Sequence, residues 1–127
     1  MEGPDQFALD FVPNLIERRI KPRFKLEIDI SISSRTCGLL SGYTVDISES
    51  GIAAIVKMEV PLGEVVELDF SPPFGRVSIY AMVRQKNAFR YGFQFVQSNL
   101  IPKIIQPTCR QLAVEKSLLG DALRSGG

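Results

Sequence analysis

Two arginines four residues apart, Arg19 and Arg23, carry the most distinctive chemistry in this sequence. Pro22 biases the residue before it toward an extended conformation, so the pair lies on a constrained connector and not along a helix face. Each guanidinium offers a planar fork that grips phosphate, chelates the O6 and N7 atoms of guanine, or stacks on a base. Arg18 stands directly before the pair. The group indicates an anion or nucleotide site; the alternative is a solvated basic run that pairs with nearby carboxylates.

A carboxylate and a hydroxyl two residues apart, Asp46 and Ser48, form the second candidate group. On an extended backbone they point the same way, so Asp46 is able to accept from guanine N1 and N2 while Ser48 meets a phosphate or a base edge. Gly51 would let the backbone turn or approach a ligand closely. The alternative is an Asx or Ser turn that closes a hairpin. Arg84 is a weaker candidate, because it either reaches the same ligand or caps a sheet edge.

Composition limits the classes of function open to the chain. Its 127 residues, 45% hydrophobic and 23% charged, are those of one globular domain. The net charge of +1 gives no long-range field toward a polyanion, which argues against DNA or RNA as a partner and against a barrel that binds single strands. Histidine is absent, and two isolated cysteines, Cys37 and Cys109, make no metal site. We therefore expect no catalysis, no metal and no cofactor.

The sequence also lacks the patterns of export and of membrane insertion. No charged segment followed by an apolar run opens the chain, and no apolar stretch approaches the roughly 20 residues that a membrane helix needs. We therefore expect a cytoplasmic protein that does not insert into a membrane.

Short, regularly spaced strands must position the candidate residues. The clearest strand covers residues 26–33, where Leu26, Ile28, Ile30 and Ile32 alternate with polar residues. Further strands are predicted at residues 38–45, 52–56, 65–70, 77–84 and 91–96. No helical pattern separates them, which indicates an all-β fold, an antiparallel barrel or sandwich of about six strands.

The two ends of the chain follow other patterns. Pro107 is suited to open a helix, the residues after it fall near helical spacing as far as Leu119, and Gly120 is suited to end it. This helix is expected to cover one face or mouth of the barrel. The predicted divisions are an apolar N-terminal extension over residues 1–16, one domain over residues 17–119, and a flexible tail over residues 120–127.

The order of the two candidate groups resembles a known family. Residues 18–23 read Arg-Arg-Ile-Lys-Pro-Arg, a strand pair follows, and residues 46–51 read Asp-Ile-Ser-Glu-Ser-Gly. This is similar to the two-part signature of PilZ domains, Arg-x-x-x-Arg followed by Asp/Asn-x-Ser-x-x-Gly. Residues 90–95, Arg-Tyr-Gly-Phe-Gln-Phe, also resemble the last strand of that family. The resemblance covers about residues 17–96.

The resemblance implies a bacterial receptor for the second messenger cyclic di-GMP, built as a six-stranded antiparallel barrel with a C-terminal helix. The ligand-binding residues that it implies are Arg18, Arg19, Arg23, Asp46, Ser48 and Gly51. Whether one or two ligand molecules bind stays open. We expect ligand to order the connector before the barrel and so to relay a signal to a downstream protein partner. The alternative is a protein-interaction module of a motility or secretion apparatus that binds no nucleotide.

Overall fold

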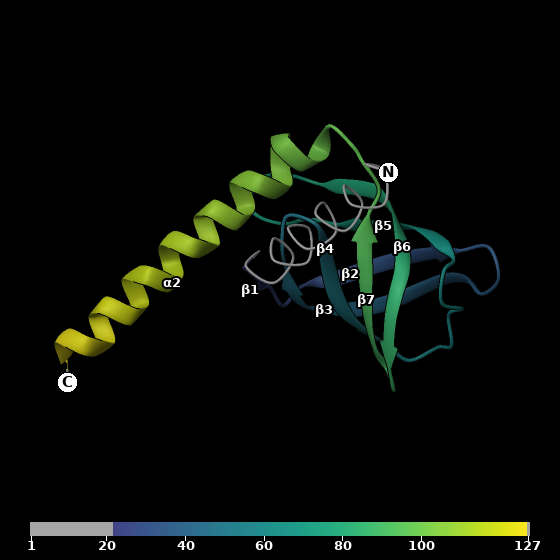
Figure 1. Ribbon diagram of the computed structural model, residues 1–127, viewed down its shortest axis with the longest axis horizontal. Coiled ribbons are helices and arrows are strands. Elements are labelled where there is room, and N and C mark those ends of the chain that lie inside the picture. The colour runs from purple at the N-terminus through teal and green to yellow at the C-terminus, as the bar shows by residue number, and fades with distance from the viewer. Residues whose placement is uncertain (1–21, 127) are drawn as a thin grey trace, which may run out of the picture.

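The computed structural model describes residues 22–126, and the side chains of residues 22–118 (Figure 1). The predicted N-terminal extension, Arg18 and Arg19 therefore lie outside the described residues.

Seven strands and one C-terminal helical segment make up the described chain. The strands are β1 (Phe24–Lys25), β2 (Asp29–Ser34), β3 (Gly38–Ile47), β4 (Gly51–Val56), β5 (Val65–Phe70), β6 (Val77–Asn87) and β7 (Arg90–Phe95). A π-helical turn, η1 (Ile101–Ile105), leads directly into the helix α2 (Gln106–Gly126).

Six of the strands close into an antiparallel barrel, which confirms the predicted fold. Their order is β3-β2-β5-β6-β7-β4, and pairing between β3 and β4 completes the ring. The short β1 is an addition that pairs with the end of β3. Alternation positions the core: Ile30 and Ile32 of β2 are buried, whereas Asp29 and Ser31 between them are exposed. The inward residues of all six strands form one apolar interior.

Two predicted strands continue further than the sequence pattern indicates. The strand predicted over residues 38–45 reaches Ile47, and the one predicted over residues 77–84 reaches Asn87. Each contains a shift of register near the predicted end, between Thr44 and Asp46 and between Val83 and Gln85. Such a bulge breaks the period of two while the ladder continues beyond it. Sequence alternation therefore ends before the strand does.

The strand predicted over residues 26–33 is interrupted, and the predicted end of the helix at Gly120 is wrong. β2 begins at Asp29, after an irregular stretch that separates it from β1. The helical segment begins earlier than Pro107, at Ile101, and α2 runs through Gly120 to Gly126. A glycine inside a helix costs only about 1 kcal/mol relative to alanine, which good helix formers on either side offset.

α2 extends away from the barrel (Figure 1). Ile105, Thr108 and Cys109 at its base are buried, whereas Val114 and Leu118 are exposed. Only the first turns of the helix therefore pack on the barrel. Within residues 22–126, no helix is both long and apolar enough to span a membrane.

Candidate ligand-binding site

A bulge at Val45 places the Asp46 side chain at the surface of the barrel. Thr44 and Asp46 are two residues apart, so regular alternation would turn both toward the interior. The register instead shifts between them. Thr44 and Ile47 are buried, and Asp46 keeps 19% of its side chain exposed. The bulge thus presents a carboxylate on the outer face without exposing the isoleucine beside it.

The hydroxyl of Thr44 binds the irregular stretch between β1 and β2, residues 26–28, which we call the joint. It lies opposite the bulge at Val45. The backbone N–H of Ile28 donates to Thr44 Oγ1 over 2.9 Å, and the Thr44 hydroxyl donates to the carbonyl oxygen of Leu26. Two backbone bonds flank them, from Leu26 N to Val45 O at 3.1 Å and from Thr44 N to Ile28 O at 2.8 Å. One side chain therefore satisfies the backbone groups that the interrupted strand leaves without ladder partners.

The joint aligns β1 with the end of β3 and so brings Arg23 to Asp46. Phe24 pairs with Ile47 and Lys25 with Asp46, which places the residue before β1 beside the carboxylate. Nε and Nη2 of Arg23 both lie 2.7 Å from Asp46 Oδ1. Residues 23 and 46, which belong to two separate sequence motifs, therefore meet in one ion pair.

Two more side chains complete the group, which we call the Asp46 cluster: Arg23, Asp46, Ser48 and Arg90. Arg90 Nη2 donates to Asp46 Oδ2 over 3.2 Å, and Arg23 Nη1 donates to Ser48 Oγ over 3.5 Å. The side chains of Arg23 and Arg90 are 44% and 51% exposed. Exposed ion pairs contribute roughly 0–1 kcal/mol each to folding, so the cluster is held together weakly enough for a ligand to rearrange it.

Ser48 and Gly51 form the turn predicted as the structural alternative for this segment. The backbone N–H of Ser48 donates to the carbonyl oxygen of Gly51 over 2.8 Å, and Ser50 N donates to Ser48 Oγ over 3.2 Å. Ser48 is buried, yet its hydroxyl also contacts Arg23. A turn, and not extended alternation, therefore brings this hydroxyl to the cluster.

Gly51 has a structural reason to be glycine. A Cβ built on it would lie 2.2 Å from the carbonyl oxygen of Phe93 in β7. The pairing of β4 with β7 at this point, where Gly51 is opposite Gln94, therefore requires the absence of a side chain.

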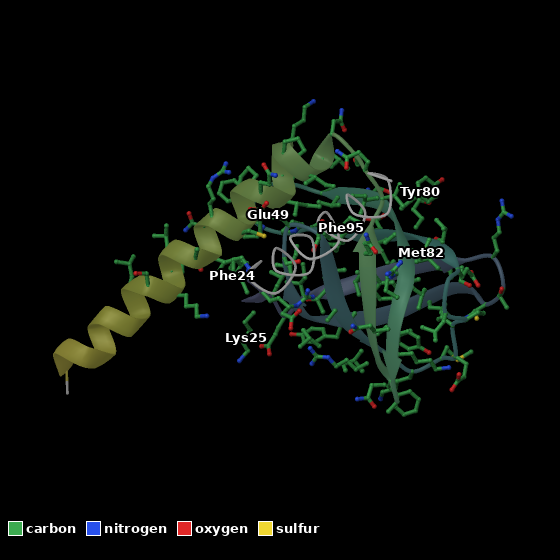
Figure 2. All side chains as sticks on the ribbon, in the orientation of Figure 1. Phe24, Lys25, Glu49, Tyr80, Met82 and Phe95 are labelled. Atoms are coloured by element: carbon green, nitrogen blue, oxygen red, sulfur yellow. The ribbon has the colours of Figure 1, made fainter. Side chains whose placement is uncertain are left out.

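The base of α2 lies next to the cluster, on the side of the barrel that carries Phe24 and Glu49 (Figure 2). Burial raises the pKa of the Cys109 thiol to about 11; the Glu49 carboxylate adds to this, while Arg23 acts in the opposite direction. A thiol with so high a pKa stays protonated near neutral pH and is a poor nucleophile. The first turns of α2 thus pack beside the cluster without adding a reactive thiol to it.

The structure brings together three of the predicted residues, Arg23, Asp46 and Ser48, while their roles in binding stay predictions. The contact that it gives to Arg84 is with Met82 Sδ of its own strand, at 4.0 Å, and not with the cluster. Arg90 was not among the predicted site residues. One signal was present in the sequence: Arg90 directly precedes the apolar Tyr91 and so points outward on the strand. The strand register, which places Arg90 near Asp46, is not contained in the local pattern.

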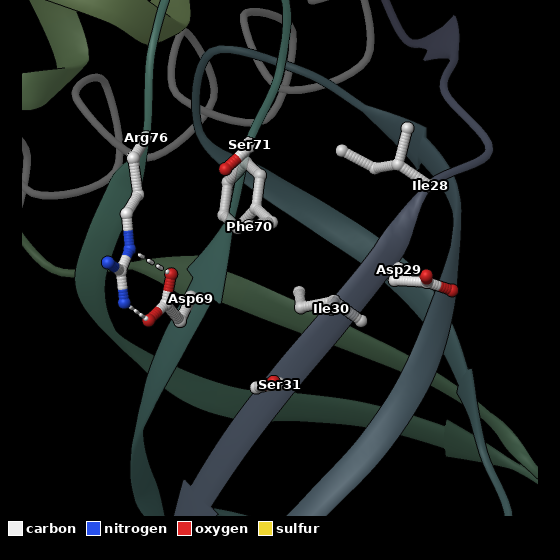
Figure 3. A pocket seen from close by; sticks show the side chains of 8 residues that line it. All are labelled: Ile28, Asp29, Ile30, Ser31, Asp69, Phe70, Ser71 and Arg76. Carbon is white, nitrogen blue, oxygen red and sulfur yellow. Dashed lines mark hydrogen bonds and ion pairs between the residues drawn. The ribbon is translucent and has the colours of Figure 1, made fainter.

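A separate hollow of about 480 Å³ lies between β2 and β5, where the two strands diverge (Figure 3). Ile30 and Phe70 line it, together with an ion pair in which Arg76 contacts both oxygens of Asp69 at 2.9 and 2.5 Å. The hydrogen bond from Arg76 lowers the pKa of Asp69 below its usual value. Neither Arg23 nor Asp46 nor Ser48 lines this hollow, so it is a feature separate from the Asp46 cluster.

Chemically, the Asp46 cluster combines two guanidinium forks, one carboxylate and one hydroxyl. The guanidinium groups suit a phosphate or the acceptor edge of a guanine, and the carboxylate suits a donor edge. A ligand that carries an anionic group and a hydrogen-bond donor edge would therefore complement it.

Comparisons with known proteins bear on the whole domain. The family model described as PilZ domain matches residues 17–104. The fold is similar to the PilZ domain of YcgR with c-di-GMP from Escherichia coli, with a TM-score of 0.61, 16% identity, and coverage of 82% of this chain and 98% of that one. No curated protein matches the chain.

Two longer structures are also similar. The structure of YcgR in complex with c-di-GMP from Escherichia coli has a TM-score of 0.66 and 18% identity, covering 84% of this chain and 50% of that one. The Bacillus subtilis inhibitor of motility (MotI/DgrA) has a TM-score of 0.59 and 18% identity, covering 72% and 50%. This chain therefore corresponds to about half the length of these two proteins, and at such identity the likeness concerns the fold.

Proposed function

Because this chain belongs to the PilZ domain family, we propose that it is a receptor that binds cyclic di-GMP and performs no reaction on it. The observation that carries the proposal is the convergence of Arg23, Asp46 and Ser48 from two separate motifs into one surface cluster. YcgR, whose fold is similar, has a structure in complex with c-di-GMP. The same convergence disfavours a protein-interaction module without nucleotide binding, which has no use for the signature residues.

Binding would exchange contacts within the cluster for contacts with the ligand. Asp46 would accept from N1 and N2 of guanine, and Ser48 would meet a phosphate or a base edge. Arg23 would turn from Asp46 toward the O6 and N7 atoms of guanine or toward a phosphate. Since the ion pair between Arg23 and Asp46 is partly exposed, breaking it costs little free energy. The charge-assisted hydrogen bonds that Arg23 would form with the ligand contribute more than this cost.

We further propose that binding relays a signal through the segment before β1. Arg23 belongs to the cluster and directly precedes β1, so a ligand that binds Arg23 would act on the adjoining connector. Arg18 and Arg19, which lie outside the described residues, would bind the same ligand from that connector. Its ordering would reposition the apolar extension for a downstream protein partner, since the ligand favours the state in which it makes more contacts.

Isothermal titration calorimetry tests the receptor, with cyclic di-GMP as ligand and cyclic di-AMP and GTP as controls. Arg23→Ala removes a contact worth about 1.5–3 kcal/mol, so the affinity should fall roughly tenfold to a hundredfold. Arg76→Ala is the matched control, because Arg76 also forms an exposed arginine–aspartate pair, away from the cluster. Absence of binding by the wild-type protein, or equal binding by Arg23→Ala, would refute the assignment.

Amide hydrogen exchange tests the relay separately. Residues 5–25 should gain protection when cyclic di-GMP saturates the protein, with little change in the strands of the barrel. Unchanged exchange in this segment despite measured binding would leave the receptor in place and exclude the relay.

A further inference from the structure

Arg90 is a member of the Asp46 cluster to which the proposed function assigns no role. It lies at the start of β7 and donates to Asp46 Oδ2 over 3.2 Å. We propose that Arg90 is a positioning residue for the ligand site: it keeps Asp46 oriented and paired with a cation when Arg23 turns toward the ligand. This inference rests on the proposed binding of cyclic di-GMP.

The two arginines divide the carboxylate between them. Both Nε and Nη2 of Arg23 lie 2.7 Å from Oδ1, whereas Arg90 contacts Oδ2. Departure of Arg23 would therefore free Oδ1 while the bond to Oδ2 remained. Oδ1 is then the oxygen available to the N1 and N2 donors of guanine.

The register of the barrel lets Arg90 reach Asp46 diagonally across β4. Arg90 pairs with Ile55, whereas Asp46 pairs with Ala53, two residues earlier in β4. Ala53 in turn pairs with Gly92 of β7, so the smallest side chains occupy the row between the two charged residues. Because β4 lies between the two residues, the arginine side chain has to span the width of that strand, and the small Ala53 opposite Asp46 leaves room for the contact at 3.2 Å.

Arg90 is attached more firmly than Arg23. The next residue along β7, Tyr91, is buried, and its hydroxyl donates to Met58 O over 2.9 Å and accepts from Val60 N over 3.0 Å. β7 also pairs along both edges, with β4 and with β6. Arg23 instead precedes a strand of two residues that pairs only with β3. The anchored arginine is therefore suited to hold the carboxylate, and the less anchored one to exchange partners.

Removal of Arg90 affects Asp46 in two ways. A carboxylate that is only 19% exposed would lose its second cation and the bond that fixes its rotation. Arg23 would become its only partner among the described residues, so the ligand would have to break the last ion pair of the carboxylate to recruit Arg23. Both effects weaken ligand binding although Arg90 itself touches no ligand atom.

A double-mutant cycle measured by calorimetry with cyclic di-GMP tests this role, using Arg90→Ala, Asp46→Ala and the double variant. Arg90→Ala alone should weaken binding about fivefold to twentyfold. In the Asp46→Ala background the same change should have less than about a twofold effect, because its target is gone. Arg90→Lys should recover part of the affinity, since an ammonium is still able to donate to Oδ2. Circular dichroism verifies folding, and Arg76→Ala serves as control.

The possible results of this experiment distinguish failure of the positioning role from failure of the receptor. An equal loss from Arg90→Ala with and without Asp46 would mean direct contact with the ligand and would overturn the positioning role. Wild-type affinity in Arg90→Ala would overturn it as well. Absence of heat from the wild-type protein is a different result: it refutes the receptor itself, and with it the inference that depends on it.

Discussion

Replacing Thr44 by valine tests whether the joint between β1 and β2 holds the site together. Valine keeps the branched shape of threonine and removes the hydroxyl, which leaves the Ile28 N–H and the Leu26 carbonyl without that partner. A buried polar group that loses its partner costs about 1–3 kcal/mol. Because Thr44 is 1% exposed, water replaces the hydroxyl poorly, and the two groups together should cost about 2–4 kcal/mol.

Urea unfolding followed by circular dichroism measures this loss. With a slope typical of small domains, the midpoint should fall by about 1–2 M while the slope stays unchanged. Because the same joint aligns Arg23 with Asp46, cyclic di-GMP should also bind more weakly to folded Thr44→Val. Thr44→Ser is the control, since it keeps the hydroxyl and loses only a methyl group, at a cost of about 1 kcal/mol. Equal losses for valine and serine, or a loss for valine below about 0.5 kcal/mol, would refute the reasoning.

Three further outcomes follow from the structure. Gly51→Ala should lower the free energy of unfolding in urea by more than about 2 kcal/mol, because its Cβ would meet a carbonyl oxygen at 2.2 Å; wild-type stability would contradict this. Hydrogen bonds, that from Ser34 foremost, lower the pKa of Glu64 below 4.5. The stability that Glu64 contributes is therefore present above pH 4.5 and is lost as the pH falls through its lowered pKa. Glu64→Gln should lower the free energy of unfolding at neutral pH and match wild type in acid. A difference from wild type that persists in acid would refute the charge effect. In thiol titration of the folded protein, half-buried Cys37 should react before Cys109, whose thiol pKa is about 11. Simultaneous reaction of the two thiols would argue against the burial of Cys109 between the first turns of α2 and the barrel.

Alternation of side chains was sufficient to predict an antiparallel barrel or sandwich, the resemblance to PilZ domains implied the barrel, and the failures of the pattern have local causes. Ile30 and Ile32 on one parity identify β2, because burial of one face imposes a period of two. At Val45 and near Arg84 the bulges interrupt that period, so the predicted strands end too early. The ladder that maintains β3 beyond Val45 includes β1, whose Phe24 and Lys25 pair with Ile47 and Asp46 from more than 20 residues away in sequence. Local pattern does not contain that information.

The residues of the candidate site also fall into those that the sequence predicts and those that only the strand register reveals. Residue type and spacing make Arg23, Asp46 and Ser48 candidates, and the order of the two motifs points to a nucleotide site because it resembles the PilZ signature. Arg90 was missed because its partner is 44 residues away and becomes visible only through the register of β4 between them. For Gly51 the sequence indicates a turn or the close approach of a ligand, and the structure adds a further reason, because the carbonyl oxygen of Phe93 in the neighbouring strand occupies the space that a side chain would need.

The attachment of α2 by its first turns alone makes the helix a lever arm. From Cys109 to the helix end at Gly126 the rise of an α-helix gives a length of about 25 Å. A rotation of about 10° at the base would displace the far end by about 4 Å over such a length. Since the base lies beside Arg23 and Glu49, a rearrangement there too small to alter the barrel is geometrically amplified at the tip. A pair of distance-sensitive probes, one on the barrel and one on the outer turns of α2, would detect such a rotation, and the outer probe would contact neither the ligand nor the barrel.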